Sequence, residues 1–199
     1  MRKAAMYIDT KRCIGCNACS MACKQENEGY GKWSFVIGGE SGTYPAPQVS
    51  VFAMLCMMCW DAPCKKQCDS LGYRAIVQRS DGIVYIDQNK CVGCRKCEGA
   101  CDYKGVLNYN PTTKKEEKCH FCMHRIDKGE LPACVVTCIG VTREFGEFDA
   151  LLKKYPNAKV MAEDDNGIRV SILYSGFGSV DEEKSLATAS YKGCIQCHD

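Results

Sequence analysis

Cysteine accounts for 18 of the 199 residues of this chain, far above its usual share in globular proteins. The charge is nearly balanced, with 26 basic and 24 acidic residues and a formal net charge of +2, so no strong basic field points to nucleic acid. A hydrophobic fraction of 46% and a charged fraction of 25% are typical of a folded domain and argue against a disordered chain.

The first residues do not resemble a cleavable export signal, because Asp9 and Lys11 come before any apolar stretch of useful length. The longest uncharged apolar run, Val51 to Trp60, has about half the length that a membrane-spanning helix needs. Closely spaced thiols without an export signal favour metal ligands over disulfides. We therefore expect a cytoplasmic protein without a membrane span of its own, or a periplasmic one exported in the folded state beside a signal-bearing partner.

Four groups of cysteines follow one another along the chain. The first has the spacing C-x2-C-x2-C-x3-C, the second C-x2-C-x4-C-x3-C, the third repeats the first, and the fourth has C-x2-C-x11-C-x3-C. In that order their members are Cys13, Cys16, Cys19 and Cys23; Cys56, Cys59, Cys64 and Cys68; Cys91, Cys94, Cys97 and Cys101; and Cys119, Cys122, Cys134 and Cys138.

The first and third groups belong to an internal repeat. Tyr7-Ile8-Asp9 precedes the first group by the same offset that separates Tyr85-Ile86-Asp87 from the third, and Gly15 matches Gly93. The second and fourth groups correspond more loosely, since each ends in C-x3-C after a proline. A unit of two cysteine groups therefore occurs twice.

Short strands and helical turns are expected around these groups. Apolar runs at Ala5 to Ile8 and at Ile83 to Ile86 predict strands that lead into the cysteine loops. A helical turn is expected to start near Cys19 and another near Cys97, each carrying the fourth cysteine of its group.

The segments between and after the groups carry weaker signals. Residues 24–50 are Gly-rich and polar, which indicates either a surface loop or, as we favour, a segment that docks a partner. Phe148, Leu151, Leu152 and Tyr155 have the spacing of a packed helix face. Residues 168–174 alternate like a half-buried strand.

The C-x2-C-x2-C-x3-C spacing is specific for iron–sulfur chemistry. Three thiolates two residues apart can wrap a compact loop around one corner of a [4Fe–4S] cluster, whereas the fourth cysteine lies too far round and ligates a second cluster. Structural zinc, the alternative, uses two C-x2-C knuckles separated by a longer spacer. The fourth group alone fits zinc, but the first and third do not.

Charged and histidine side chains lie close to the cysteines. Lys24, Lys65, Lys66, Arg95 and Lys96 either offset the negative charge of clusters or are ordinary solvated charges, and the sequence leaves both interpretations open. His120 and His124 flank Cys122, where we expect them to tune or solvate a cluster rather than ligate it. No catalytic dyad, phosphate loop or nucleotide fingerprint is evident.

The order of the four groups, with Tyr7-Ile8-Asp9 before the first and the runs Lys118 to Cys122 and Leu131 to Cys138 closing the set, resembles a known family. It is similar to the four-cluster ferredoxin-like electron-transfer subunits of the dimethyl sulfoxide reductase (molybdopterin oxidoreductase) family, over about residues 4–150. The resemblance implies an α+β fold. Two ferredoxin-like modules with two [4Fe–4S] clusters each would be related by pseudo-twofold symmetry, loop-rich and followed by a C-terminal extension.

The resemblance also implies nested pairing of the sixteen cysteines, group one with group four and group two with group three. The implied ligand sets are Cys13, Cys16, Cys19 and Cys138; Cys119, Cys122, Cys134 and Cys23; Cys56, Cys59, Cys64 and Cys101; and Cys91, Cys94, Cys97 and Cys68. Residues 1–50 and 108–160 would form an outer module, 51–107 an inner module, and 161–199 the extension.

In function, the resemblance implies an electron-transfer subunit with no catalytic site of its own. Four clusters would relay electrons between a large molybdopterin or tungstopterin subunit and a membrane quinone-reactive subunit, a cytochrome or a soluble carrier, in a complex associated with the membrane. One alternative is a polyferredoxin subunit of a cytoplasmic tungsten aldehyde-type or aromatic-ring oxidoreductase. Another is a zinc-bound structural scaffold.

The remaining two cysteines close the chain in the sequence Cys194-Ile195-Gln196-Cys197-His198. This matches the attachment signature of c-type haem, in which two thiols bind the vinyl groups and the histidine ligates iron. The polar residues before it show little sign of an apolar haem pocket, so we favour a tail without haem. Such a tail would bind an adventitious metal or form a disulfide.

Overall fold

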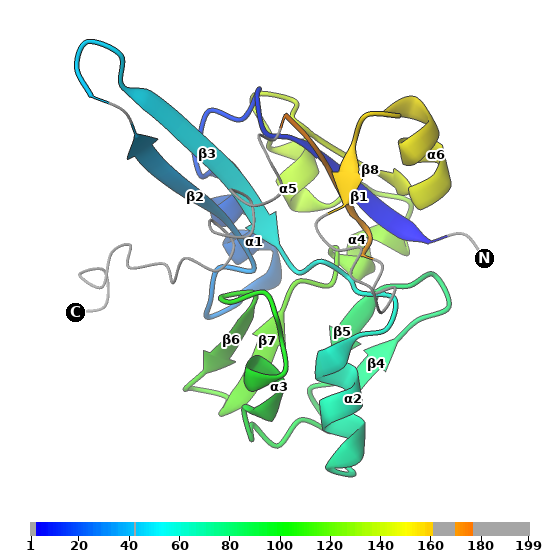
Figure 1. The fold of residues 1–199 in the computed structure, drawn as a ribbon. Helices are drawn as coiled ribbons and strands as arrows, with labels where there is room; N and C mark the ends of the chain where they lie inside the picture. Colours follow the sequence, from blue (N-terminus) through cyan, green and yellow to red (C-terminus); the bar gives the residue numbers. More distant parts are fainter. Residues whose placement is uncertain (1–2, 42, 161–169, 177–199) are drawn as a thin grey trace.

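A four-stranded mixed sheet forms the upper part of the molecule in the computed structural model, which describes residues 3–41, 43–160 and 170–176 (Figure 1). Its strand order is β8-β1-β10-β9, with β1 parallel to β10 and antiparallel to β8. The strands are β1 (Ala4–Asp9), β8 (Arg143–Glu147), β9 (Lys159–Val160) and β10 (Ile172–Ser175). The first and last described strands thus meet in one sheet, and the cysteine groups lie between them in sequence.

Both faces of β1 are covered, because successive side chains of a strand point to opposite sides. Ala5 and Tyr7 pack with Leu151 of helix α6 (Phe148–Lys154), whereas Met6 and Ile8 join the main core. The Tyr7 ring stacks on Tyr155 with ring centroids 3.6 Å apart. The predicted first strand is confirmed. The predicted helix face is confirmed for Phe148, Leu151 and Tyr155, whereas Leu152 is exposed.

The expected half-buried strand at residues 168–174 differs in the structure. Strand β10 begins at Ile172 and is buried on both faces, with Leu173 and Tyr174 fully shielded from solvent. It lies inside the sheet between β1 and β9, where alternation of apolar and polar residues is not needed. Ile168, the first residue of the predicted strand, lies outside the described residues.

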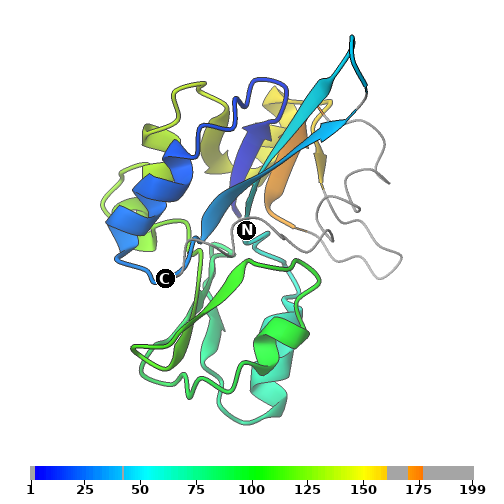
Figure 2. The ribbon, with the colours of Figure 1, turned by 90° about the vertical axis from the view of Figure 1, so that its left-hand side faces the viewer.

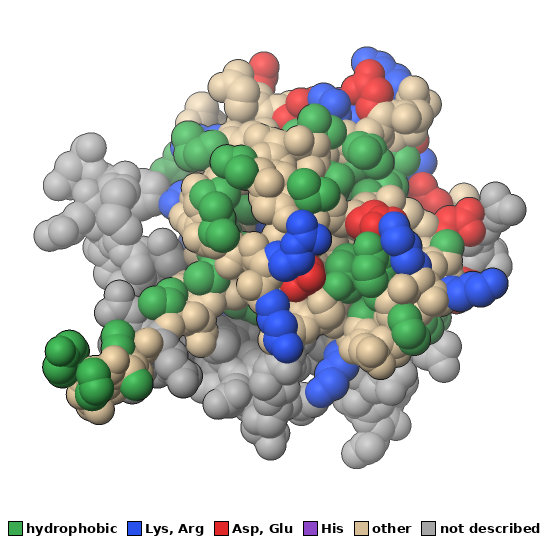
Figure 3. All heavy atoms as spheres, turned by 90° about the horizontal axis from the view of Figure 1, so that it is seen from above, with side chains coloured by type: hydrophobic (Ala, Val, Ile, Leu, Met, Phe, Trp, Pro, Cys, Tyr) green, Lys and Arg blue, Asp and Glu red, His purple; other side chains and the backbone are tan. Residues whose placement is uncertain are grey.

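Residues 24–50 do not form a loop throughout. Helix α1 (Ala18–Asn27) extends into the segment, and a two-stranded hairpin of β2 (Ser34–Ser41) and β3 (Gln48–Leu55) follows. The hairpin projects from the body of the molecule in both side views (Figures 1 and 2). Seen from above, hydrophobic side chains gather on its outer end (Figure 3), where Tyr44 is 94% exposed.

The lower part of the molecule contains two further hairpins and two helices (Figures 1 and 2). Its elements are β4 (Ile76–Gln78), β5 (Val84–Ile86), β6 (Leu107–Asn110), β7 (Lys115–Lys118), α2 (Pro63–Ser70) and α3 (Lys96–Gly99). Strand β5 confirms the predicted strand before the third cysteine group. Two one-turn helices, α4 (Met123–Ile126) and α5 (Ala133–Val136), return the chain to the upper part.

The two predicted helical turns have different outcomes. Helix α1 carries both Cys19 and Cys23, as expected. Helix α3 carries Cys97 but ends after a single turn, so that Cys101 lies beyond it. There the chain bends, and the Cys101 thiol lies 3.3 Å from the Tyr103 carbonyl oxygen.

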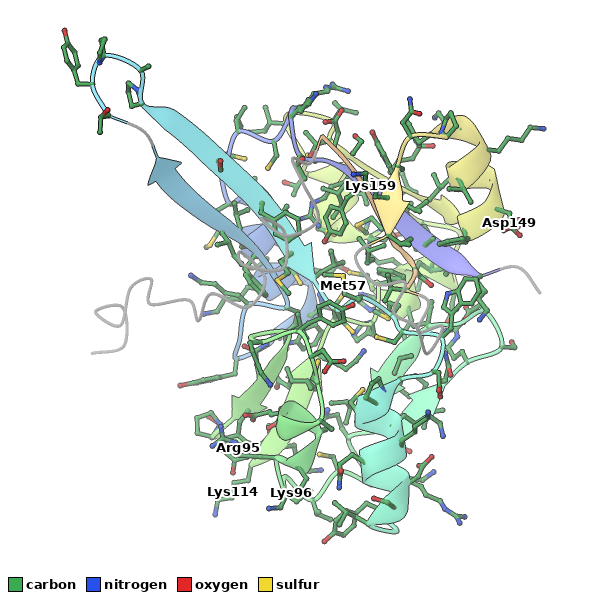
Figure 4. All side chains as sticks on the ribbon, in the orientation of Figure 1. Met57, Arg95, Lys96, Lys114, Asp149 and Lys159 are labelled. Atoms are coloured by element: carbon green, nitrogen blue, oxygen red, sulfur yellow. The ribbon has the colours of Figure 1, made fainter. Side chains whose placement is uncertain are left out.

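The main core runs through both parts of the molecule and contains many methionine and cysteine side chains. Met54, Met57 and Met58 are fully buried, and buried cysteines pack among them. Met57 lies near the middle of the molecule, between its upper and lower parts (Figure 4). Within the described ranges, no helix is both long and apolar enough to cross a membrane.

Candidate iron–sulfur centres

The loops of the first and third cysteine groups have nearly identical backbone conformations. Gly15 and Gly93 adopt φ of +70° and +69°, and the residues before the helices, Asn17 and Arg95, adopt φ of 57° and 58°. Positive φ favours glycine because it has no Cβ. A Cβ on Gly93 would lie 2.0 Å from the Lys114 carbonyl oxygen, so this loop also needs glycine for close packing. The sequence repeat is therefore a structural repeat.

The structure gathers the sixteen described cysteines into four sets, each drawn from two sequence groups. Set A lines one hollow, set C a second and set D a third, and the members of set B interact electrostatically. Set A is Cys13, Cys16, Cys19 and Cys138; set B is Cys23, Cys119, Cys122 and Cys134; set C is Cys56, Cys59, Cys64 and Cys101; set D is Cys68, Cys91, Cys94 and Cys97.

The side-chain amide of Asn27 contacts two cysteines of set B. The Asn27 Nδ2 atom lies 3.7 Å from the sulfur of Cys23 and 3.7 Å from that of Cys122. One side chain at the end of α1 thus reaches thiols from two sequence groups that are far apart in the chain. This contact fixes α1 against the loop before α4.

The four sets follow one another through the molecule. Cys134 of set B interacts electrostatically with Cys19 of set A. Cys119 of set B interacts with Cys56 of set C. Cys97 of set D interacts with Cys64 of set C. The resulting order is A, B, C, D.

The donor chemistry of the sets fits a cationic cofactor. Burial raises the pKa of Cys23 and of Cys97 to about 12, and that of Cys64 to about 11, so the thiols do not ionise on their own at neutral pH. A bound metal centre deprotonates coordinating thiols outright. The hollows lined by sets A, C and D have volumes of about 340, 410 and 360 Å³ and open to solvent.

Hydrogen-bond donors point at several of the sulfurs. The backbone N–H of Ala75 donates to Cys68 at 3.3 Å, and that of Phe121 to Cys119 at 3.4 Å. Cys138 accepts the Thr142 N–H at 3.3 Å and lies 3.2 Å from its hydroxyl. Burial opposes ionisation of Cys138, but these hydrogen bonds and the charge of Arg143 outweigh it and lower the pKa of the thiol. Such donors stabilise negative charge on sulfur.

Two buried cations contact the cysteines, and the sequence patterns did not single them out. The Arg143 guanidinium donates to Cys19 at 3.3 Å, and Lys118 interacts with Cys56, Cys64 and Cys119. Lys118 is 3% exposed and Arg143 4%. The one available sequence signal was the position of Lys118 directly before Cys119; nothing in the spacing marked Arg143.

The five cations that the sequence did single out are more accessible. Lys24 and Lys96 are exposed. Lys65 pairs with Asp69, Lys66 with Asp61 and Arg95 with Glu98. Of the two interpretations, solvated surface charges describe these side chains better, since exposed pairs interact weakly with distant groups.

The two histidines differ in environment. His120 is largely buried, its Nδ1 atom accepts the Met123 N–H at 3.1 Å, and burial lowers its pKa to about 4. His124 pairs with Glu26 at 2.9 Å on the surface. Among the described residues, no three His, Cys, Asp or Glu side chains are grouped as a site for a single metal ion. The C-terminal Cys194, Cys197 and His198, with the haem signature, lie outside the described residues.

Two family models match the chain. The 4Fe-4S dicluster domain matches residues 47–148, and the 4Fe-4S binding domain matches residues 6–26. The two matches together span all four cysteine groups. They support iron–sulfur clusters over the zinc scaffold.

Curated relatives extend the match to most of the chain. The B component of the tetrathionate reductase of Salmonella typhimurium is 34% identical over 86% of this chain and 72% of its own length. The B component of the anaerobic dimethyl sulfoxide reductase of Escherichia coli is 34% identical over 78% of this chain and 79% of its own. The arsenate respiratory reductase iron-sulfur subunit ArrB of a Shewanella species is 29% identical over 87% and 97%.

A mixed helix and strand fold with ferredoxin-like 4Fe–4S domains defines an iron–sulfur electron-transfer protein. More particularly, the chain belongs to the family of iron–sulfur subunits of the dimethyl sulfoxide, tetrathionate and arsenate reductases, which are molybdopterin oxidoreductases.

Proposed function

We propose that this protein relays electrons through four [4Fe–4S] clusters, one in each of sets A, B, C and D. It would carry them between a molybdopterin or tungstopterin catalytic subunit and a membrane quinone-reactive or soluble redox partner. The observation that carries the proposal is the spatial order of the sets, each made of three cysteines from one sequence group and one from another.

Sets A and B would belong to an outer module of residues 1–50 and 108–160, and sets C and D to an inner module of residues 51–107. The matching backbone of the Gly15 and Gly93 loops supports a pseudo-twofold relation between them. Residues 161–199 would form the C-terminal extension. Within each module, each set takes its fourth cysteine from the sequence group that supplies the other three of its neighbour, so the two sets of a module are linked through the chain.

Each bound cluster would supply reversible one-electron transfer, with a potential tuned by its charge, hydrogen bonds and exposure. The chain's own residues hold the sulfurs, donate hydrogen bonds to them and shield set B from water. All four set B cysteines are buried, whereas Cys16 of set A and Cys94 of set D are exposed. Electrons would therefore enter and leave at the two ends of the series.

Both ends carry exposed apolar side chains. Beside set A these are Ile14, Ile139 and Val141, which suit a permanent partner such as the catalytic subunit. At set D they are Leu71, Tyr73 and Val92. Near set D, Arg95, Lys96 and Lys114 also lie together at the lower end of the molecule (Figure 4). By the family resemblance, the outer module with set A would face the catalytic subunit.

Metal analysis of the purified protein tests the number of clusters. About sixteen iron atoms and sixteen sulfides per chain are expected, with the broad brown absorption of [4Fe–4S] clusters. About eight iron atoms per chain would refute four clusters, and about four zinc atoms in place of iron would restore the scaffold interpretation.

Paired cysteine variants test the ligand sets. Cys13→Ser and Cys23→Ser alter the same sequence group but different sets. We expect electron paramagnetic resonance (EPR) spectra of the two reduced variants to lose different signals. Cys23→Ser and Cys119→Ser should instead affect the same signal. If Cys13→Ser and Cys23→Ser removed the same one, the nested pairing would be wrong.

A further inference from the structure

Two basic side chains lie in the interior at the junctions between neighbouring cysteine sets. Arg143, at the start of β8, donates to Cys19 of set A at 3.3 Å and interacts electrostatically with Cys134 of set B. Lys118, at the end of β7, interacts with Cys119 of set B and with Cys56 and Cys64 of set C. Each cation therefore faces two sets rather than one.

The contacts of Lys118 hold its ammonium group in place. Its Nζ atom donates to the Val84 carbonyl oxygen and, at 2.8 Å, to that of Cys119. These two carbonyls come from β5 and from the residue after Lys118, so the side chain ties the β4–β5 hairpin to the start of the fourth cysteine group. Arg143 is similarly fixed, with its guanidinium 3.8 Å from the Met6 sulfur as well as bonded to Cys19.

A buried cation is costly unless negative charge lies beside it. The charge neighbours of Arg143 and Lys118 are mainly cysteine thiols, which are neutral when protonated and negative when they ligate iron. Both side chains therefore need the clusters for charge compensation. The clusters in turn gain a fixed positive charge in a medium of low dielectric constant, where its effect is larger than at the surface.

Set D has a different environment. The cations that line or adjoin its hollow, Arg95 and Lys96, are exposed. The Arg95 guanidinium forms an ion pair with the Glu98 carboxylate, with Nε and Oε1 2.9 Å apart, which partly neutralises its charge. Solvent and salt screen such charges, so their effect on a nearby redox centre is small. Set D thus provides an internal reference for the other three.

We propose that Arg143 and Lys118 are junction cations that raise the reduction potentials of the clusters on both sides, Arg143 those of sets A and B and Lys118 those of sets B and C. Reduction adds one electron to a cluster, and a fixed positive charge nearby stabilises the reduced form. The proposal rests on the four-cluster function proposed above. It assigns these two residues a positioning and tuning role that is separate from cluster ligation.

Redox titration followed by EPR tests this in the intact iron-loaded protein. Arg143→Gln should lower the equilibrium constant for reduction of the clusters in sets A and B at least tenfold. This corresponds to a fall of about 59 mV in the reduction potential of each one-electron centre. Lys118→Gln should do the same for sets B and C. The reduction potential of the cluster in set D should be unchanged in both variants. Signals are assigned beforehand with Cys13→Ser, Cys23→Ser, Cys59→Ser and Cys94→Ser.

Matched variants separate charge from packing. Lys24→Gln removes an exposed charge directly beside Cys23 of set B and should leave all four potentials unchanged. Arg143→Lys and Lys118→Arg keep the charge and should restore potentials close to those of the unmodified protein. Iron content is measured for every variant.

Unshifted potentials in fully loaded Arg143→Gln and Lys118→Gln would overturn the proposal, as would a shift of equal size in set D. If a Gln variant loses iron, the charge-conserving variant at the same position, Arg143→Lys or Lys118→Arg, distinguishes a charge role from a packing role. Full iron and unchanged potentials in Arg143→Lys or Lys118→Arg support a need for charge, whereas loss of iron there too shows a packing role and refutes the proposal. A failure of the four-cluster function itself would be seen separately, as too little iron or too few signals in the unmodified protein.

Discussion

Gly15 and Gly93 occupy equivalent places in two cysteine loops, yet their surroundings differ. Both have a positive φ that disfavours other residues. A Cβ on Gly15 would meet only the Val51 side chain, at 3.3 Å, which can shift. A Cβ on Gly93 would overlap the Lys114 backbone at 2.0 Å, so that either the loop or the β6–β7 turn must move.

We therefore expect Gly93→Ala to be far more damaging than Gly15→Ala. The positive φ alone costs about 1–2 kcal/mol in either variant, and the backbone overlap adds to it only at Gly93. Thermal denaturation and iron content of the purified variants measure the difference. Gly99→Ala is the control, because a Cβ there meets nothing within 4 Å. Equal stability of the Gly93 and Gly15 variants would contradict this account of the loop.

At the scale of residues, the sixteen candidate ligands could be predicted because their spacing recurs and reports local loop geometry. Arg143 and Lys118 could not be predicted, because burial of a long charged side chain depends on which distant strands cover it. The Lys118 amine, for example, is held by the Val84 carbonyl of another hairpin. A sequence pattern carries no trace of such a contact.

The β2–β3 hairpin shows what element-scale patterns miss. Gly38 and Gly39 and the polar residues around them suggested a loop, but each glycine pairs across the hairpin, with Val51 and Ser50. Cross-strand pairing supplies the backbone hydrogen bonds that a loop would leave to water. The strand β1 was predictable by contrast, because its residues are all apolar between charged ends.

The outer end of this hairpin is expected to contact the catalytic subunit. Tyr44 is 94% exposed, and an aromatic anchor of this kind often contributes a large share of binding energy. Tyr44→Ser should weaken co-purification of the two subunits, by roughly tenfold in affinity, without loss of iron. Leu152→Ser, at an exposed site of α6, is the control. Unchanged affinity of the Tyr44 variant would place the interface elsewhere.

The junction of β8 and α6 should respond to pH. Hydrogen bonds from Lys154 at 2.8 Å and from the Tyr155 hydroxyl at 2.6 Å lower the pKa of Glu144 below its ordinary value. A lowered folded-state pKa gives stability that is complete above the ordinary glutamate pKa and is lost as pH falls through the folded-state value.

Glu144→Gln should accordingly reduce the thermal stability slightly at pH 7, and the difference from the unmodified protein should shrink as the pH falls below about 4. The effect is small because the side chains are partly exposed. If the stability difference between Glu144→Gln and the unmodified protein grew as the pH fell, the inferred stabilising role of the Glu144 carboxylate would be wrong.

At the scale of the whole molecule, the structure is built around its cysteine sets. They form a continuous series through the main core, while the β8-β1-β10-β9 sheet closes the upper part by joining the chain's first and last described strands. The repeat could be predicted from the cysteine spacing and the apolar runs, whereas the α+β fold was implied by the family resemblance. The parallel pairing of β1 with β10 could not, because it joins segments about 165 residues apart without a shared motif.

Removal of iron is therefore expected to unfold most of this protein. The buried cations Arg143 and Lys118 lose their negative partners when the thiols protonate. Unpaired buried charges are strongly destabilising. In other metal-coupled folds the binding energy of the metal is the folding energy.

Anaerobic chelation followed by circular dichroism and thermal denaturation measures this loss. The cooperative transition should disappear with the iron and return when iron and sulfide are added back under reducing conditions. The small cluster of Ala5, Tyr7, Leu151 and Leu173 includes none of the cysteines and cannot hold the lower part of the molecule by itself. An iron-free chain that kept native circular dichroism and a sharp transition would show that the apolar sheet and the methionine core fold without the clusters.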